Sequence, residues 1–69
     1  MPIEIKPWGL EKHLEEEVTM HYGGRIRKGF LRYLKDDDMF FLDCPEGRIE
    51  IADGEKIKIR GREYITRLR

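Results

Sequence analysis

The chain has 69 residues, enough for one domain with a small core, and its 14 basic and 14 acidic residues leave no net charge to draw it to nucleic acid or a membrane. A single cysteine, Cys44, excludes a disulfide within the chain, and no spacing of cysteines and histidines indicates a structural metal. We therefore expect a reduced, cytoplasmic protein without cofactor or metal, stabilised in part by oligomerisation.

The first predicted element is a short helix over residues 7–17, which follows an N-terminal extension, residues 1–6. A proline at its first position suits the first turn, and Leu10 and Leu14 lie four residues apart on one helix face. The three glutamates at 15–17 would oppose the dipole at the end of the helix, so we expect the helix to end there.

Strand periodicity follows from Val18 onwards. Residues 18–22 alternate between apolar and polar side chains, and the glycine pair at 23 and 24 predicts a hairpin. Residues 25–34 keep strand-forming side chains but lose the alternation around Gly29, which indicates a sharply bent strand.

The second half of the chain continues with short strands separated by polar turns. Strand-like runs occupy residues 39–44, 49–51, 56–60 and 63–69, and the pair Asp53 and Gly54 predicts a tight turn. One helix followed by about five short, strongly bent strands predicts a mostly β fold, a small open barrel over residues 18–69 in a single domain, residues 1–69.

This order of features resembles the Sm-like family, small barrels that assemble into rings and bind RNA. The sequence GFL at 29–31 matches the glycine, variable residue and leucine of the family's bent strand. The sequence IRG at 59–61 matches the isoleucine, arginine and glycine that precede the family's last strand. The resemblance covers about residues 7–68, and it implies a homo-oligomeric ring, a hexamer or heptamer, closed by pairing the last strand of one subunit with an edge strand of the next.

The resemblance also implies an RNA site, in which Arg60 flanks the base and Gly61 lets the backbone turn close to the ligand. In relatives that bind uridine-rich RNA, an asparagine after the bent strand bonds to the base. Its position here falls on Met39, or on Phe40 if the turn shifts by one residue, and neither side chain is an amide. Met39 or Phe40 would face the base and Lys35 would meet phosphate, so we predict binding of single-stranded RNA with altered or weakened preference for uridine.

The same residues allow other interpretations. Arg60 could pair with a carboxylate of a neighbouring subunit, and the turn at 35–38 is typical of a solvated polar turn. Its three aspartates are a poor match for a cation site, because the glycine and glutamate of a calcium loop are missing. The alternative function is an oligomeric scaffold or protein-interaction module on the same barrel, without RNA binding.

Other classes of protein find little support in the residues. The chain has no serine and no glycine-rich phosphate loop, so we expect no enzyme activity. Cys44 is expected to be a buried, unreactive thiol, and His13 and His21 to lie at a surface or interface. No run approaches the roughly 18 apolar residues of a membrane span, and the 41% of charged residues resembles thermophile proteins.

The apolar run at residues 40–42 is too long to be buried on one side of a strand. We expect Phe40 and Leu42 to face one way and Phe41 the other. Phe41 would then be covered by the helix or by another subunit.

Overall fold

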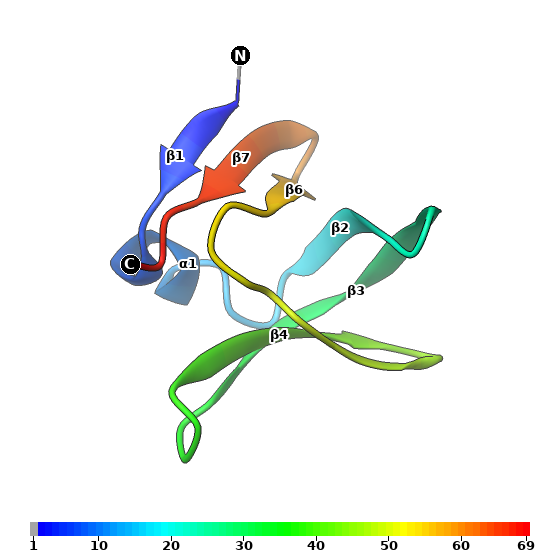
Figure 1. Ribbon diagram of the computed structural model, residues 1–69, viewed down its shortest axis with the longest axis horizontal. Helices are drawn as coiled ribbons and strands as arrows, with labels where there is room; N and C mark the ends of the chain where they lie inside the picture. Colours follow the sequence, from blue (N-terminus) through cyan, green and yellow to red (C-terminus); the bar gives the residue numbers. More distant parts are fainter. Residues whose placement is uncertain (1) are drawn as a thin grey trace.

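The computed structural model describes residues 2–69 as one seven-stranded sheet with a single short helix (Figure 1). The elements in chain order are β1 (Ile3–Ile5), α1 (Pro7–Glu11), β2 (Glu17–Tyr22), β3 (Arg25–Leu34), β4 (Met39–Cys44), β5 (Gly47–Glu50), β6 (Lys56–Ile59) and β7 (Arg62–Thr66). Across the sheet the strand order is β1-β7-β6-β2-β3-β4-β5. The mostly β fold, with a short N-terminal helix and a bent open sheet, is confirmed. No helix within residues 2–69 is long and apolar enough to cross a membrane.

The long strand β3 belongs to two hairpins and joins the two halves of the sheet. It pairs with β2 from Arg25 to Phe30 and with β4 from Phe30 to Leu34. Gly29 lies where the partners change, and a Cβ atom there would approach the carbonyl oxygen of Asp43 to 2.5 Å. The absence of a side chain therefore lets β3 and β4 come together at the place where the sequence predicts the bend.

The core lies on one face of the curved sheet, with α1 at its end. Alternate residues of the strands point to it, as the burial of Ile57 and Ile59 between exposed lysines illustrates. The buried cluster comprises Ile5, Leu10, Val18, Met20, Leu31, Phe40, Leu42, Cys44, Ile49, Ile51, Ile57 and Ile59. We call the opposite side of the sheet the outer face.

Residues 40–42 divide between the two faces as predicted. Phe40 and Leu42 belong to the core cluster, whereas Phe41 is buried outside it. The Arg48 guanidinium lies 4.9 Å from the centre of the Phe41 ring, a distance suited to a cation–π contact. Phe41 is thus already buried within a single chain, and a side chain of the neighbouring strand β5 contributes to its cover.

The helix is shorter than predicted. It ends at Glu11 instead of residue 17, and residues 12–16 form turns. Glu15 has a φ of 70°, its amide donates to the carbonyl of Leu31 at 2.8 Å, and the Leu31 amide donates to the carbonyl of Glu16 at 3.0 Å. Pairing with β3 thus satisfies backbone groups that a longer helix would have bonded internally.

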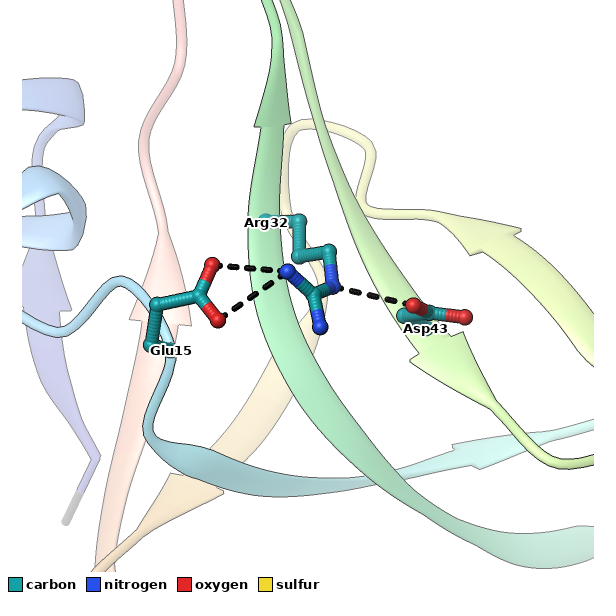
Figure 2. Close-up of polar contacts among 3 residues, drawn as sticks. All are labelled: Glu15, Arg32 and Asp43. Carbon is teal, nitrogen blue, oxygen red and sulfur yellow. Dashed lines mark hydrogen bonds and ion pairs between the residues drawn. The ribbon is translucent and has the colours of Figure 1, made fainter.

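An ion-pair cluster on the outer face fastens this turn to the sheet (Figure 2). The Arg32 guanidinium in β3 donates from Nη1 to both carboxylate oxygens of Glu15, at 2.8 and 3.0 Å. Its Nε donates to Asp43 Oδ2 in β4 at 2.9 Å. Arg32 therefore connects the turn after α1 to the β3–β4 hairpin.

The predicted N-terminal extension contains a strand. Ile3–Ile5 pairs in parallel with β7, so that Ile3 lies opposite Tyr64 and Ile5 opposite Thr66. The last strand therefore lies between β1 and β6, and the edges of the sheet are β1 and β5. The expectation that the last strand offers a free edge to the next subunit was wrong, because β1 already occupies that edge.

The two predicted turns, at Gly23 and Gly24 and at Asp53 and Gly54, connect different kinds of strand pair. Gly23 and Gly24, with φ angles of 61° and 76°, join the paired strands β2 and β3 as predicted. Asp53 and Gly54 form a turn too, but it lies in the crossover from the edge strand β5 to the interior strand β6. Buried Thr66 holds this crossover: its hydroxyl donates to the Ala52 carbonyl at 2.6 Å and accepts from the Glu55 amide at 2.8 Å.

Cys44 is buried in the core, as predicted, and burial raises the pKa of its thiol, with the charge of Glu46 adding to the effect. The folded pKa thus lies above the unfolded value of about 8.5, so this thiol's contribution to stability is complete below that pH and is lost as the pH rises through the folded pKa. In urea titrations at neutral and alkaline pH, we expect Cys44→Ala to lose less stability than the wild type on going to alkaline pH. An equal alkaline loss in both proteins would contradict this assignment.

Candidate nucleic-acid interface

The sharpest local feature of the outer surface is the turn at residues 60 and 61, which we call the Arg60 turn. Ile59 and Arg62 form the last pair between β6 and β7, so Arg60 and Gly61 make a two-residue hairpin loop. Their φ angles are 52° and 78°. Positive φ at both positions is the mark of a type I′ turn, whose right-handed twist matches the flanking strands and whose usual first residue is asparagine, aspartate or glycine. This geometry explains why strand alternation stops at 60 and resumes at once.

Arginine is an unusual residue in the left-handed conformation, and it brings a cost of about 1–2 kcal/mol. Its side chain is 77% exposed, so burial in the core does not explain its presence. The Arg60 Nε lies 3.0 Å from Glu16 Oε1, the same oxygen that His13 Nδ1 approaches to 3.2 Å. The carboxylate that pairs with Arg60 thus comes from its own chain.

The two residues of the Arg60 turn border a hollow on the surface. The hollow has a volume of ≈ 450 Å³. Its other lining residues come from β2, from the turn before β2 and from β6: Glu16, Glu17, Thr19 and Lys58. Two cationic and two anionic side chains thus surround one opening. An anionic ligand there would compete with Glu16 for the Arg60 guanidinium.

The other residues of the predicted site lie elsewhere. Met39 and Phe40 border a separate hollow of ≈ 310 Å³ with Asp38 and Arg69, and Lys35 is exposed on the turn between β3 and β4. Figure 1 shows this turn and the β6–β7 turn at opposite ends of the molecule. The structure therefore brings Arg60 and Gly61 together, but within one chain it does not bring them to the other three residues.

Phe40 is packed in the hydrophobic core. It is 5% exposed, belongs to the core cluster, and its ring centre lies 5.0 Å from that of Tyr33. The Tyr33 hydroxyl in turn donates to the Asp38 carboxylate, a hydrogen bond that raises the pKa of Tyr33. Phe40 is thus packed on its neighbours and has little free ring face to offer a base.

Sequence reasoning missed the lysines of β6. Lys56 and Lys58 alternate with buried Ile57 and Ile59, so both lie on the outer face together with the start of the Arg60 turn. The alternation in KIKIR is the signal that could have found them. Across the sheet, Thr19 lies opposite Lys58 on one side and Lys28 on the other, which adds a third lysine to this face.

A metal centre finds no support within residues 2–69. No group of three or more histidine, cysteine, aspartate or glutamate side chains gathers there to hold an ion. The three aspartates of the turn at 35–38 therefore do not form such a site, and one of them is engaged by Tyr33.

Comparison with known proteins gives no relative from which a role could be transferred. The chain matches no protein-family model, no curated protein and no solved structure. The chemistry of the Arg60 turn has to be inferred from its own residues.

The strain at Arg60 gives a testable expectation for stability. Replacing Arg60 by asparagine, the residue type I′ turns favour, should raise the free energy of unfolding by about 1 kcal/mol, because relief of strain exceeds the value of an exposed ion pair. Urea denaturation measures this change, and Glu16→Gln is the control: it removes the charge that pairs with Arg60 and contacts His13, and leaves the turn itself unchanged. A lower stability of Arg60→Asn would mean that pairing with Glu16 outweighs the strain.

Proposed function

We propose that this protein binds single-stranded RNA at the Arg60 turn. The observation that carries the proposal is an exposed arginine at a strained turn position where glycine or asparagine would be more stable. Strained backbone positions occur preferentially at ligand sites. A guanidinium held there can stack on any base or donate two hydrogen bonds to a phosphate.

The resemblance to the Sm-like family supports the same ligand, because the sequence IRG at 59–61 ends in this turn. Of the residues that the resemblance assigns to base recognition, Met39 and Phe40 lie away from Arg60 and neither is an amide. We therefore propose binding with little preference for uridine. Stacking on an arginine or aromatic surface is worth about 1–3 kcal/mol per base and does not depend on which base is present.

Fluorescence anisotropy with labelled U-rich and A-rich ten-nucleotide RNAs tests the proposal at low and moderate salt. We expect Arg60→Ala to weaken binding of both RNAs about tenfold or more, and added salt to weaken wild-type binding further. Arg69→Ala is the matched control, since it removes an equal charge beside the other hollow. Absence of wild-type binding at low salt, or equal losses in the two variants, would contradict an RNA site at Arg60.

A second candidate function is self-association into a scaffold, which the open edges of the sheet favour. The edge strands β1 and β5 each have a neighbouring strand on one side only, and such edge strands readily pair with another chain. Two large apolar side chains at this edge are exposed: Ile3 in β1 by 49% and Trp8 in the following helix α1 by 66%. We propose that β1 of one copy pairs with β5 of the next, in place of the last strand, to close the hexamer or heptamer that the resemblance implies.

Light scattering tests this assembly. A ring of six or seven chains should have six or seven times the 8.3 kDa mass of the chain. A ring that binds neither RNA at low salt would favour the scaffold, whereas a monomer that binds RNA would rule out the ring and leave the Arg60 site standing.

A further inference from the structure

The outer face of β6, β2 and β3 carries features that the Arg60 turn alone does not explain. We infer that this face is a track for extended single-stranded RNA, with phosphates over β6 and bases over β2 and β3. The inference rests on the proposed RNA binding at Arg60, and it extends that site along the sheet by about two nucleotides.

The first part of the track is a row of cations on β6. Lys56 and Lys58 are exposed, point to the outer face and lead directly to Arg60. Alternate residues of a strand lie about 7 Å apart, a spacing that suits successive phosphates of an extended strand. The row therefore presents three cationic side chains to three consecutive phosphates.

The second part is a set of exposed apolar and aromatic side chains on the strands beside it. Ile26 and Phe30 on β3 are 68% and 48% exposed, and Lys28 lies between them. The register places Ile26 opposite His21 and Phe30 opposite Glu17, so these side chains share the outer face with the lysines of β6. The rings of His21 and Phe30 offer surfaces on which bases can stack.

Spacing and shape connect the two parts. One strand, β2, separates β6 from β3, which places the cation row and the exposed β3 side chains about 10 Å apart. Between them lies a hollow of ≈ 330 Å³, whose lining includes Thr19, His21, Ile26, Lys56, Lys58 and Glu63 from the three strands and β7. A nucleotide with its phosphate on a lysine would place its base over this hollow.

The acidic residues of the face weaken the track. Glu63 lies opposite Lys58 in the β6–β7 pairing, and Lys28 Nζ lies 3.9 Å from Glu17 Oε1. These carboxylates would repel phosphate, so neutralising one of them should strengthen RNA binding. An acidic peptide would also bind more tightly after a carboxylate is neutralised, whereas an apolar partner would not. We favour RNA over an acidic peptide because the face combines cations with side chains on which bases can stack.

The test measures anisotropy of the labelled A-rich RNA with Lys56→Ala and Lys58→Ala over a series of salt concentrations. Each variant should weaken binding about three- to tenfold and reduce the slope of log affinity against log salt by about one, as expected when one phosphate contact is lost. Phe30→Ala should weaken binding without changing that slope, and Glu63→Gln should strengthen it. Arg69→Ala is the matched control, because it removes one positive charge beside the separate hollow at Met39 and Phe40.

The outcomes distinguish failure of the track from failure of RNA binding at Arg60. Loss of binding in Arg60→Ala with unchanged binding in Lys56→Ala and Lys58→Ala would overturn the track and leave the Arg60 site. Equal weakening by Arg69→Ala would also overturn it, since the attraction would then be unspecific. No RNA binding by the wild type at low salt would overturn both, and tighter binding of an Asp- and Glu-rich peptide than of RNA would assign the face to a protein partner instead.

Discussion

Replacing Gly29 by alanine is expected to lower the free energy of unfolding by about 3 kcal/mol. The added Cβ would lie 2.5 Å from the carbonyl oxygen and 2.8 Å from the carbonyl carbon of Asp43, and both atoms belong to the backbone of β4. A flexible side chain could move aside, but here the paired strands β3 and β4 must separate. For a domain of this size, such a loss is a large part of the total stability.

Urea denaturation followed by circular dichroism measures the effect. Gly23→Asn is the control, because it changes a glycine in the β2–β3 turn where a Cβ would meet nothing within 4 Å and where asparagine tolerates a φ of 61°. We expect little change in stability from this control. If Gly29→Ala were as stable as the wild type, the close approach of β3 and β4 at this position would be wrong.

Replacing Thr66 by valine is expected to lower the free energy of unfolding by about 2 kcal/mol. Valine keeps the shape of the side chain but removes the hydroxyl that bonds to the Ala52 carbonyl and the Glu55 amide. Thr66 is fully buried, so water cannot simply take the place of the hydroxyl. The crossover between β5 and β6 would thereby lose two of its attachments to β7.

Urea denaturation measures the loss, and hydrogen exchange of the Glu55 amide locates it. Thr66→Ser retains the hydroxyl and removes one methyl group, so its loss of stability should be about 1 kcal/mol and its Glu55 amide should stay protected. Equal protection of this amide in Thr66→Val would show that the hydroxyl does not hold the crossover.

Local patterns were sufficient to predict most of the sheet. The alternation around Val18 and around Ile57 and the glycine pair at 23 and 24 identify strands and a hairpin that the structure contains. The pattern at residues 40–42 correctly predicts which ring enters the core. In each case the signal lies within a few neighbouring residues, because the side chains of a strand alternate between its two faces.

The features that sequence reasoning missed depend on contacts between distant residues. Residues 3–5 are too few to show a strand period, and what makes them a strand is the partner β7. The helix ends early because Glu15 and Glu16 bond to Leu31, which no pattern near residue 15 indicates. The strand missed for this reason is β1, which precedes α1; the six strands after α1 correspond to the six strand-like runs of the sequence, although only about five strands were expected.

The candidate site was predictable in part. The sequence IRG located an exposed arginine at a turn, and the structure has one there. Lys35, Met39 and Phe40 were assigned by counting along a family motif, and their distance from Arg60 depends on how β3 and β4 cross the sheet. RNA binding itself stays a prediction, as does the ring.

The parallel pairing of the first strand with the last has a consequence for how the protein is made. During synthesis, residues 3–5 leave the ribosome before β7, and their place in the sheet does not exist until β7 has followed. Pairings between the ends of a chain are slow to form, and a growing chain without its last strand leaves β6 open on one side. The residues of β7 thus decide when β1 can join the sheet, so a nascent chain stalled before residue 62 would expose β1 and β6 to other chains.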